Sequence, residues 1–171
     1  METWDAIRAR RNVRTYTATP IPPADLDRIL EAGRISPSAS NRQKWDFVAV
    51  TDREQLQALT AVWQGARHLA GAAAAIVMVL PEPEAERYRT IDQYDLGQAT
   101  MLMMLAAADL GIGSGHSAVA DQDACRRILG VPDDRTCAYM LALGYPDDRP
   151  LAPLRHHDRR PFDDVVHRGH W

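Results

Sequence analysis

The sequence predicts a single domain that mixes α-helices with β-strands, and three observations support this. Its 171 residues are the length of one domain with its own core. Apolar residues recur at the helical spacing i, i+3, i+4, i+7 within residues 24–33. Residues 73–80 are instead almost continuously apolar, as expected for a strand that is buried on both faces.

The N-terminal part is predicted to hold two helices. Residues 3–10 form a short amphipathic segment with Trp4 and Ile7, and Ala6 as a further candidate, on one face. Proline is favoured in the first turn of a helix, so Pro22 and Pro23 mark the start of the second helix.

A strand, a helix and another strand are expected next. Residues 45–50 form the first strand. The residues from Thr51 to Glu54 have the types of a capping box, which begins a helix that continues to about Trp63. The strand at residues 73–80 follows, and prolines end it.

The longest predicted helix covers about residues 84–110. Its second half, residues 96–110, is apolar almost all round. A helix that is apolar on every side is buried on every side. One small domain cannot supply that much cover, so a second copy of the chain is expected to pack against it.

A glycine-rich strand and loop at residues 111–117, a helix at 121–129 and a strand at 136–143 complete the predicted domain. A polar segment punctuated by prolines then covers about residues 147–171. Such a segment either dangles or wraps a neighbour, and the aromatic residues near its end favour wrapping. The whole of residues 1–171 is therefore read as one domain with a C-terminal arm.

Composition excludes several classes of protein. A formal net charge of −3 argues against a general affinity for nucleic acid. Cys125 and Cys137 have no close spacing, so neither a disulfide framework nor a zinc site is expected. No apolar run is long enough to cross a membrane, and the acidic opening is not a signal peptide, so a cytoplasmic protein is expected. No closed zinc pattern fits the spacing of the C-terminal histidines, His156, His157, His167 and His170.

Two polar segments are candidates for ligand binding. Arg10, Arg11 and Arg14 crowd their guanidinium groups beside Asn12, and such groups match phosphate oxygens with paired hydrogen bonds. A second segment, residues 36–45, is rich in small hydroxyls and amides where a helix should end. Taken singly, the first is more often a solvated surface and the second an ordinary helix-ending loop. Together they suggest a cofactor with a phosphate and a polar heterocycle.

Four segments, in order and spacing, resemble the nitroreductase family of flavoenzymes. They are Arg10 to Tyr16, Ser36 to Phe47, Asp95 to Ser114, and Arg159 to His167. The resemblance implies an α+β fold, in which helices flank a central, mostly antiparallel sheet in three layers. It also implies an intertwined homodimer with the C-terminal arm on the partner.

The resemblance further implies an FMN site built from both subunits. The first segment would hold the phosphate and the flavin edge, the second would reach the flavin from the other subunit, and Arg159 would return to the phosphate. His68 is added because it lies just before the buried strand, and backbone amides after the glycine loop are added as contacts to the ring. The candidate cofactor-binding residues are Arg10, Arg11, Asn12, Arg14, Pro37, Ser38, Ala39, Asn41, His68, Ser117, Ala118, Arg159 and Arg160.

The expected function is that of an FMN-dependent oxidoreductase using NADH or NADPH. It would reduce nitroaromatics, quinones or similar flat acceptors by ping-pong hydride transfer at flavin N5, with no catalytic side chain and no metal. One alternative is a flavin-binding relative with a dedicated dehydrogenation or dehalogenation chemistry. Another is a non-catalytic binding module whose arginine-rich ends contact an anionic partner.

Overall fold

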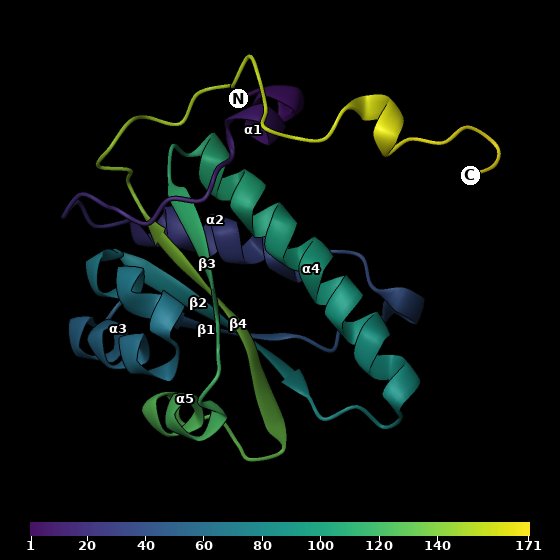
Figure 1. The fold of residues 1–171 in the computed structure, drawn as a ribbon. Coiled ribbons are helices and arrows are strands. Elements are labelled where there is room, and N and C mark those ends of the chain that lie inside the picture. Colours follow the sequence, from purple (N-terminus) through teal and green to yellow (C-terminus); the bar gives the residue numbers. More distant parts are fainter.

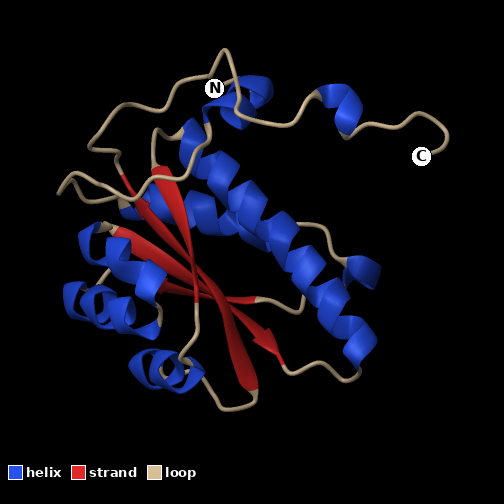
Figure 2. Cartoon of the chain, viewed as in Figure 1, coloured by secondary structure: helices blue, strands red, loops and turns tan.

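The structure, a computed structural model, describes residues 1–171 and is built on a four-stranded antiparallel sheet (Figure 1). The strand order is β1-β2-β4-β3. The strands are β1 (Asp46–Val50), β2 (Ala74–Pro81), β3 (Gly113–Ala118) and β4 (Arg135–Gly144). Figure 2 shows helices on both faces of the sheet, so the predicted three-layer α+β fold is confirmed.

One face of the sheet is covered by α2 (Pro23–Arg34) and α4 (Glu86–Asp109), and α1 (Thr3–Ala9) packs on α4. The other face is covered by α3 (Arg53–Leu59), α5 (Gln122–Leu129) and two 3₁₀ turns, η2 (Thr60–Val62) and η3 (Gln64–Gly71). Two further 3₁₀ turns, η1 (Ala39–Asn41) and η4 (Phe162–Asp164), lie outside these layers.

Strand β2 joins the two cores because its side chains alternate between them. Ile76 and Met78 belong to the core beneath α2 and α4. Val77 and Val79 belong to the core beneath α3 and α5. The continuous apolar run was therefore a correct sign of a strand buried on both faces, although its neighbours are antiparallel rather than parallel.

Local details differ from expectation around α3 and α1. Asp52 rather than Thr51 caps α3, since its carboxylate accepts the N–H of Gln55 at 2.9 Å, and the α-helix ends at Leu59 before two 3₁₀ turns. On α1 the small residues Ala6 and Ala9 are buried. Trp4 and Ile7 are instead 68% and 44% exposed within one chain. The face of α1 that meets α4 carries these two alanines, whose small side chains allow the helices to approach closely.

Helix α4 is buried on one side only within a single chain. Met103 and Met104 are fully buried against α2 and the sheet. Met101 is 42% exposed and Tyr94 is 70% exposed on other sides of the same helix. All-round burial therefore does not occur within one chain. No helix in the structure has the length and apolar character needed to span a bilayer.

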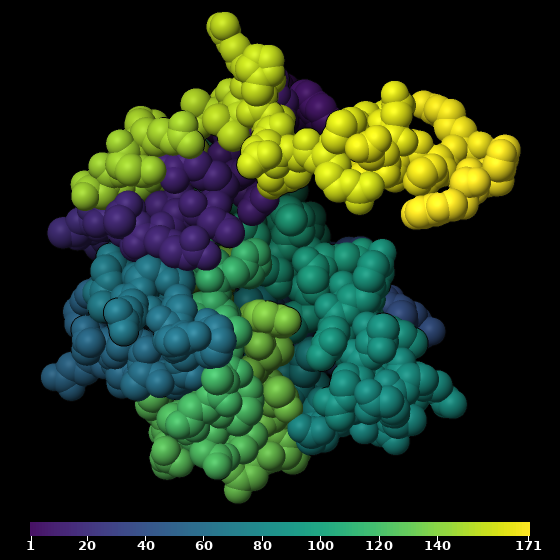
Figure 3. Space-filling model, viewed as in Figure 1, coloured from purple at the N-terminus to yellow at the C-terminus, as the bar shows by residue number.

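The chain after β4 first returns to the N-terminal segment and then leaves the domain. Leu154 donates its N–H to the carbonyl of Arg8 at 3.2 Å, and the guanidinium of Arg8 donates back to the carbonyl of Leu154 at 2.7 Å. Figure 3 shows this yellow-green tract over the purple N-terminal residues, while the yellow end extends away from the body. Residues 155–171 are exposed, and no contact in one chain shows where the arm docks.

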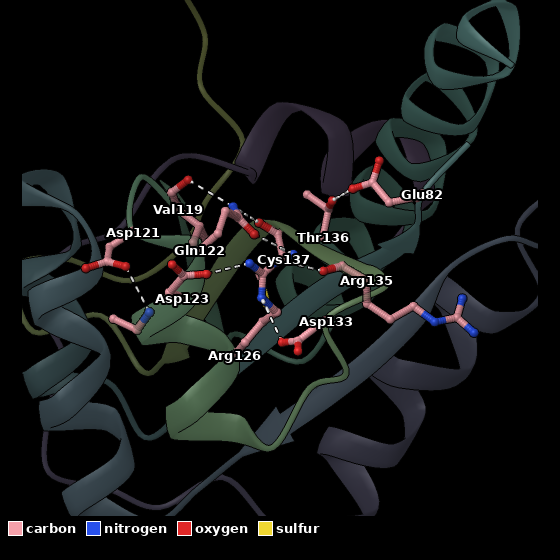
Figure 4. A network of polar contacts seen from close by, with 11 residues as sticks. Glu82, Val119, Asp121, Gln122, Asp123, Arg126, Asp133, Arg135, Thr136 and Cys137 are labelled. Atoms are coloured by element: carbon pink, nitrogen blue, oxygen red, sulfur yellow. Dashed lines mark hydrogen bonds and ion pairs between the residues drawn. The ribbon is translucent and has the colours of Figure 1, made fainter. Parts of the chain in front are cut away.

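Helix α5 is fixed to β4 through one side-chain amide (Figure 4). Gln122 donates to the carbonyl of Cys137 and accepts its N–H, both at 2.9 Å. A further contact from the same amide reaches the carbonyl of Val119 at 3.3 Å. This network holds the segment that connects β3 to α5.

Candidate cofactor site

The first arginine-rich segment lies directly along β3. Val13 donates its N–H to the carbonyl of Ser114 at 2.8 Å, and Asn12 pairs with Ser114 in a parallel bridge. A Cβ on Gly113 would lie 2.6 Å from the Val13 side chain, and a Cβ on Gly115 would lie 2.4 Å from its carbonyl oxygen. Glycines at these two positions therefore allow the segment to sit against the strand.

The charges of Arg10 and Arg14 act on two histidines beside this strand. Burial lowers the pKa of His116, and the charges of Arg10 and Arg14 lower it further. Burial is also the main cause of the lowered pKa of His68, to which Arg14 contributes. We call Arg10, Arg14, His68 and His116 the cationic cluster. Neither arginine forms an ion pair with a carboxylate of the chain.

Arg11 has a different contact from the one expected. Its guanidinium donates to the carboxylate of Asp148 at 2.6 Å and to the carbonyl of Arg149 at 2.8 Å. The hydrogen bond from Arg11 lowers the pKa of Asp148. The side chain thus ties the segment after β4 to the N-terminal segment.

His68 connects η3 to β3. Its Nδ1 lies 3.1 Å from the carbonyl oxygen of Gly65, and its Nε2 lies 3.4 Å from that of Gly115. Further along, the carbonyl of Val62 accepts the N–H groups of Ala120 and Asp121. These contacts align residues 62–68 with residues 115–121, so Ser117 and Ala118 lie between the two attachment points.

The second polar segment is held on α4. The buried carboxylate of Asp95 accepts the N–H of Ala39 at 2.9 Å. Ser40, Asn41 and Gln43 adopt left-handed backbone angles, with φ of 51°, 53° and 49°. Such angles are uncommon for residues other than glycine, and they expose the polar tip of the loop. Pro37, Ser38 and Ala39 line a hollow with Ile91 and Tyr94 of α4.

The structure of one chain does not bring the two segments together. Figure 1 shows η1 (blue, at the right) across α4 from the first segment (purple). Arg159 and Arg160 donate only to nearby carbonyls, those of Asp158 and Asp164. One chain therefore presents two separate groups of the predicted residues, as a site shared between two subunits requires.

An apolar groove adjoins the cationic cluster. It runs between α4, with Gly97 and Met101, and the sheet, with His116 and Tyr139. His116 belongs to both features, yet its role is not evident from sequence. The only signal for it was its position inside the glycine-rich strand.

This arrangement defines a class of site. Two unpaired guanidinium groups suit a phosphate, glycines leave β3 open to close approach, and the groove suits a flat, largely apolar ring. The residues present therefore fit FMN, which combines these parts. The fold is that of an α+β protein, and its candidate site has the chemistry to fit a flat, phosphate-bearing molecule.

Comparison with known proteins agrees with this class. The model of the Nitroreductase family matches residues 7–67 and 61–145. A protein of Archaeoglobus fulgidus named for NADH dehydrogenase/NAD(P)H nitroreductase is 35% identical over 171 aligned residues, with 96% of each chain covered. An NADPH-flavin oxidoreductase of Vibrio harveyi is 26% identical, covering 99% of this chain and 74% of its own. In fold, an FMN-dependent nitroreductase of Clostridium difficile has a TM-score of 0.85 at 24% identity, covering 97% and 98% of the two chains.

The chain belongs to the nitroreductase family. The prediction of an oxidoreductase enzyme of this family is confirmed. The predicted cofactors agree with the names of the relatives, which include flavin, FMN and NAD(P)H.

Proposed function

We propose that two copies of this chain jointly bind FMN and use NADH or NADPH to reduce flat electron acceptors such as nitroaromatics and quinones. The observation that carries the proposal is the pair Arg10 and Arg14, which lie beside β3 without a carboxylate partner. Isolated positive charges that no acid of the chain balances favour an anionic ligand. When bound, FMN supplies hydride chemistry at its N5 atom.

The residues of one subunit have distinct roles in this proposal. Arg10 and Arg14 hold the phosphate. Asn12 and the backbone amides at Ser117 and Ala118 contact the ring. Their N–H groups can donate to the edge of the ring on which negative charge develops, and such donors stabilise that charge. Arg11 remains a candidate for the same phosphate, because only its Nη2 is bonded to Asp148 and Arg149 and its buried Nε has no partner.

The partner subunit supplies the rest. Its copies of Pro37, Ser38, Ala39 and Asn41 approach the flavin from the other side of the interface. The exposed face of α4, with Met101, is the expected contact between subunits. The C-terminal arm, exposed in one chain, brings Arg159 and Arg160 toward the partner's phosphate site. The result is a homodimer with two equivalent sites.

The proposed mechanism is ping-pong, with the two substrates exchanging over one flavin face. Only residues 110–112 connect α4 to β3, and we infer that this part of the chain leaves one flavin face open. The nicotinamide can then leave before the acceptor enters. Free thiols at Cys125 and Cys137 agree with a reducing cytoplasm, which we retain as the proposed location.

The test is the absorption spectrum of the purified chain with added FMN, followed by anaerobic addition of NADH or NADPH. We expect a flavin spectrum that co-purifies with the dimer, bleaches with a reduced nicotinamide and recovers with a benzoquinone or a nitroaromatic. A monomer that retains no flavin absorbance once unbound FMN is removed would contradict the proposal and favour the binding-module alternative. Bound flavin that neither nicotinamide reduces would favour a dedicated chemistry on another substrate.

A further inference from the structure

The short stretch of backbone that carries Arg14 is fixed at both ends. Before it, Val13 is buried and donates its N–H to the carbonyl of Ser114 on β3 at 2.8 Å. After it, Thr17 donates its N–H to the carbonyl of Tyr145, just beyond β4, at 2.9 Å. Arg14 itself is exposed. Its side chain therefore projects from a turn whose two ends rest on different strands of the sheet.

The side chain of Tyr16 closes this turn from within. Its hydroxyl donates to the carbonyl oxygen of Val13 at 2.6 Å. A Cβ on Gly144 would lie 2.7 Å from the Tyr16 ring, and a Cβ on Gly115 would lie 3.1 Å from its hydroxyl oxygen. Glycines at these two positions leave room for the ring to reach from the end of β4 to the carbonyl of Val13. The residue between the bonded groups is Arg14.

The hydroxyl of Tyr16 is the partner of this carbonyl within the chain, because the carbonyl of Val13 accepts no backbone N–H. Burial raises the pKa of Tyr16, and the charge of Arg14 lowers it by less. The phenol thus keeps its proton at neutral pH and can donate it. Phenylalanine would fill the same space without this hydrogen bond.

We propose that Tyr16 is a positioning residue for the FMN phosphate and that it acts through Arg14. Its hydrogen bond holds the backbone on both sides of Arg14, so the guanidinium is presented from an ordered turn. Ordering before binding reduces the conformational entropy that binding would otherwise cost. The inference rests on the proposed function, because it needs a phosphate at Arg14, and it goes further by assigning a residue that acts through another side chain.

Tyr145 provides a matched control for Tyr16. It is a neighbouring tyrosine whose side chain packs against the core beneath α2 and α4. Its backbone carbonyl accepts the N–H of Thr17, whereas its hydroxyl forms no hydrogen bond within the chain. Tyr145→Phe therefore removes the same atom as Tyr16→Phe without removing a contact to the turn.

The first experiment measures the affinities of the apoprotein for FMN and for riboflavin, which lacks the phosphate, by quenching of flavin fluorescence. Wild type, Tyr16→Phe and Tyr145→Phe are compared. We expect Tyr16→Phe to weaken FMN about threefold to tenfold, the range of one hydrogen bond, and to weaken riboflavin much less. Tyr145→Phe should bind both ligands as wild type does. Equal losses for the two ligands in Tyr16→Phe, or an unchanged affinity for FMN, would overturn the inference.

A double-mutant cycle tests whether Tyr16 acts through Arg14. If it does, Tyr16→Phe should cost no further FMN affinity in a protein that already carries Arg14→Ala. Losses that add would give Tyr16 a role independent of Arg14 and would also overturn the inference. None of these outcomes affects the proposed function. Wild type that binds no FMN would instead contradict the proposed function, and the inference with it.

A further measurement needs no variant and therefore does not depend on how Tyr16→Phe folds. If the turn is ordered before the ligand arrives, the amides of Val13 and Thr17 should be protected from hydrogen exchange in the free protein. FMN should add little to this protection. Protection that appears only with FMN would show that the ligand orders the turn, and the positioning role of Tyr16 would be wrong.

Discussion

The buried carboxylate of Asp95 accepts the backbone N–H of Ala39 at 2.9 Å, across 56 positions of sequence. This bond ties the loop after α2 to the middle of α4. The loop contains Ser40 and Asn41 in left-handed conformations, which cost free energy unless surrounding contacts hold them. Asp95 thus fixes the loop to the helix whose exposed face is the proposed subunit contact, and the two should move as one unit.

Asp95→Ala should release this loop. The substitution leaves the Ala39 N–H without its acceptor, which costs about 1–3 kcal/mol of unfolding free energy. Hydrogen exchange at Ala39 and the loop after it should accelerate, and denaturant unfolding gives the loss of stability. The control is Gln98→Ala, which removes only a 3.4 Å contact to the same carboxylate. Unchanged exchange at Ala39 would show that Asp95 does not hold the loop.

Gly115→Ala should disturb the cationic cluster. The new Cβ would lie 2.4 Å from the carbonyl oxygen of Val13 and 3.3 Å from His68 Nε2. Because backbone must move to admit it, we expect a loss of about 1–3 kcal/mol in unfolding free energy together with weaker FMN binding. Gly71→Ala is the control, since nothing lies within 4 Å of its Cβ position. Wild-type stability and FMN affinity in the Gly115→Ala variant would show that the segment is not held this tightly.

Local sequence signals were sufficient for most elements of the fold. The continuous apolar run of β2 and the Pro23 start of α2 each reflect interactions within a few residues. The apolar face of α1 was predicted from Trp4, Ile7 and Ala6, and of these only Ala6 is buried in one chain, because side-chain hydrophobicity alone does not show which face packs. The helix instead packs through Ala6 and Ala9, and that choice depends on the surface of α4, which the sequence of α1 does not contain.

Only part of the candidate site could likewise be predicted from local sequence. The three arginines at the N-terminus were predicted as one cluster, but Arg11 pairs with Asp148, 137 positions away. Such a partner leaves no trace in the local pattern. The effect of the Arg10 and Arg14 charges on the pKa of His116 also depends on a strand pairing between distant segments. Gly113 and Gly115 were the only local sign that two stretches of backbone meet there.

The phosphate assignment predicts a difference between two ligands. Changing Arg10 and Arg14 together to Ala should weaken FMN by at least about tenfold, because charge-assisted hydrogen bonds to the phosphate are lost. Riboflavin, which has no phosphate, should be affected much less. Quenching of flavin fluorescence measures both affinities. Arg34→Ala is the control, since that side chain is exposed and pairs with Glu31. Equal losses for FMN and riboflavin would contradict the assignment.

The interface assignment predicts that Met101 and Met103 respond differently to the same change. Met101 is 42% exposed on α4, whereas Met103 is fully buried and its side chain lies 2.9 Å from where a Cβ on Gly33 would be. Met101→Glu should therefore dissociate the dimer and release FMN while the far-ultraviolet circular dichroism of the fold persists. Met103→Glu should unfold the chain itself, because it buries a charge within one subunit. Light scattering separates the two cases, and a Met101→Glu protein that remains a dimer with bound flavin would place the subunit contact away from this face of α4.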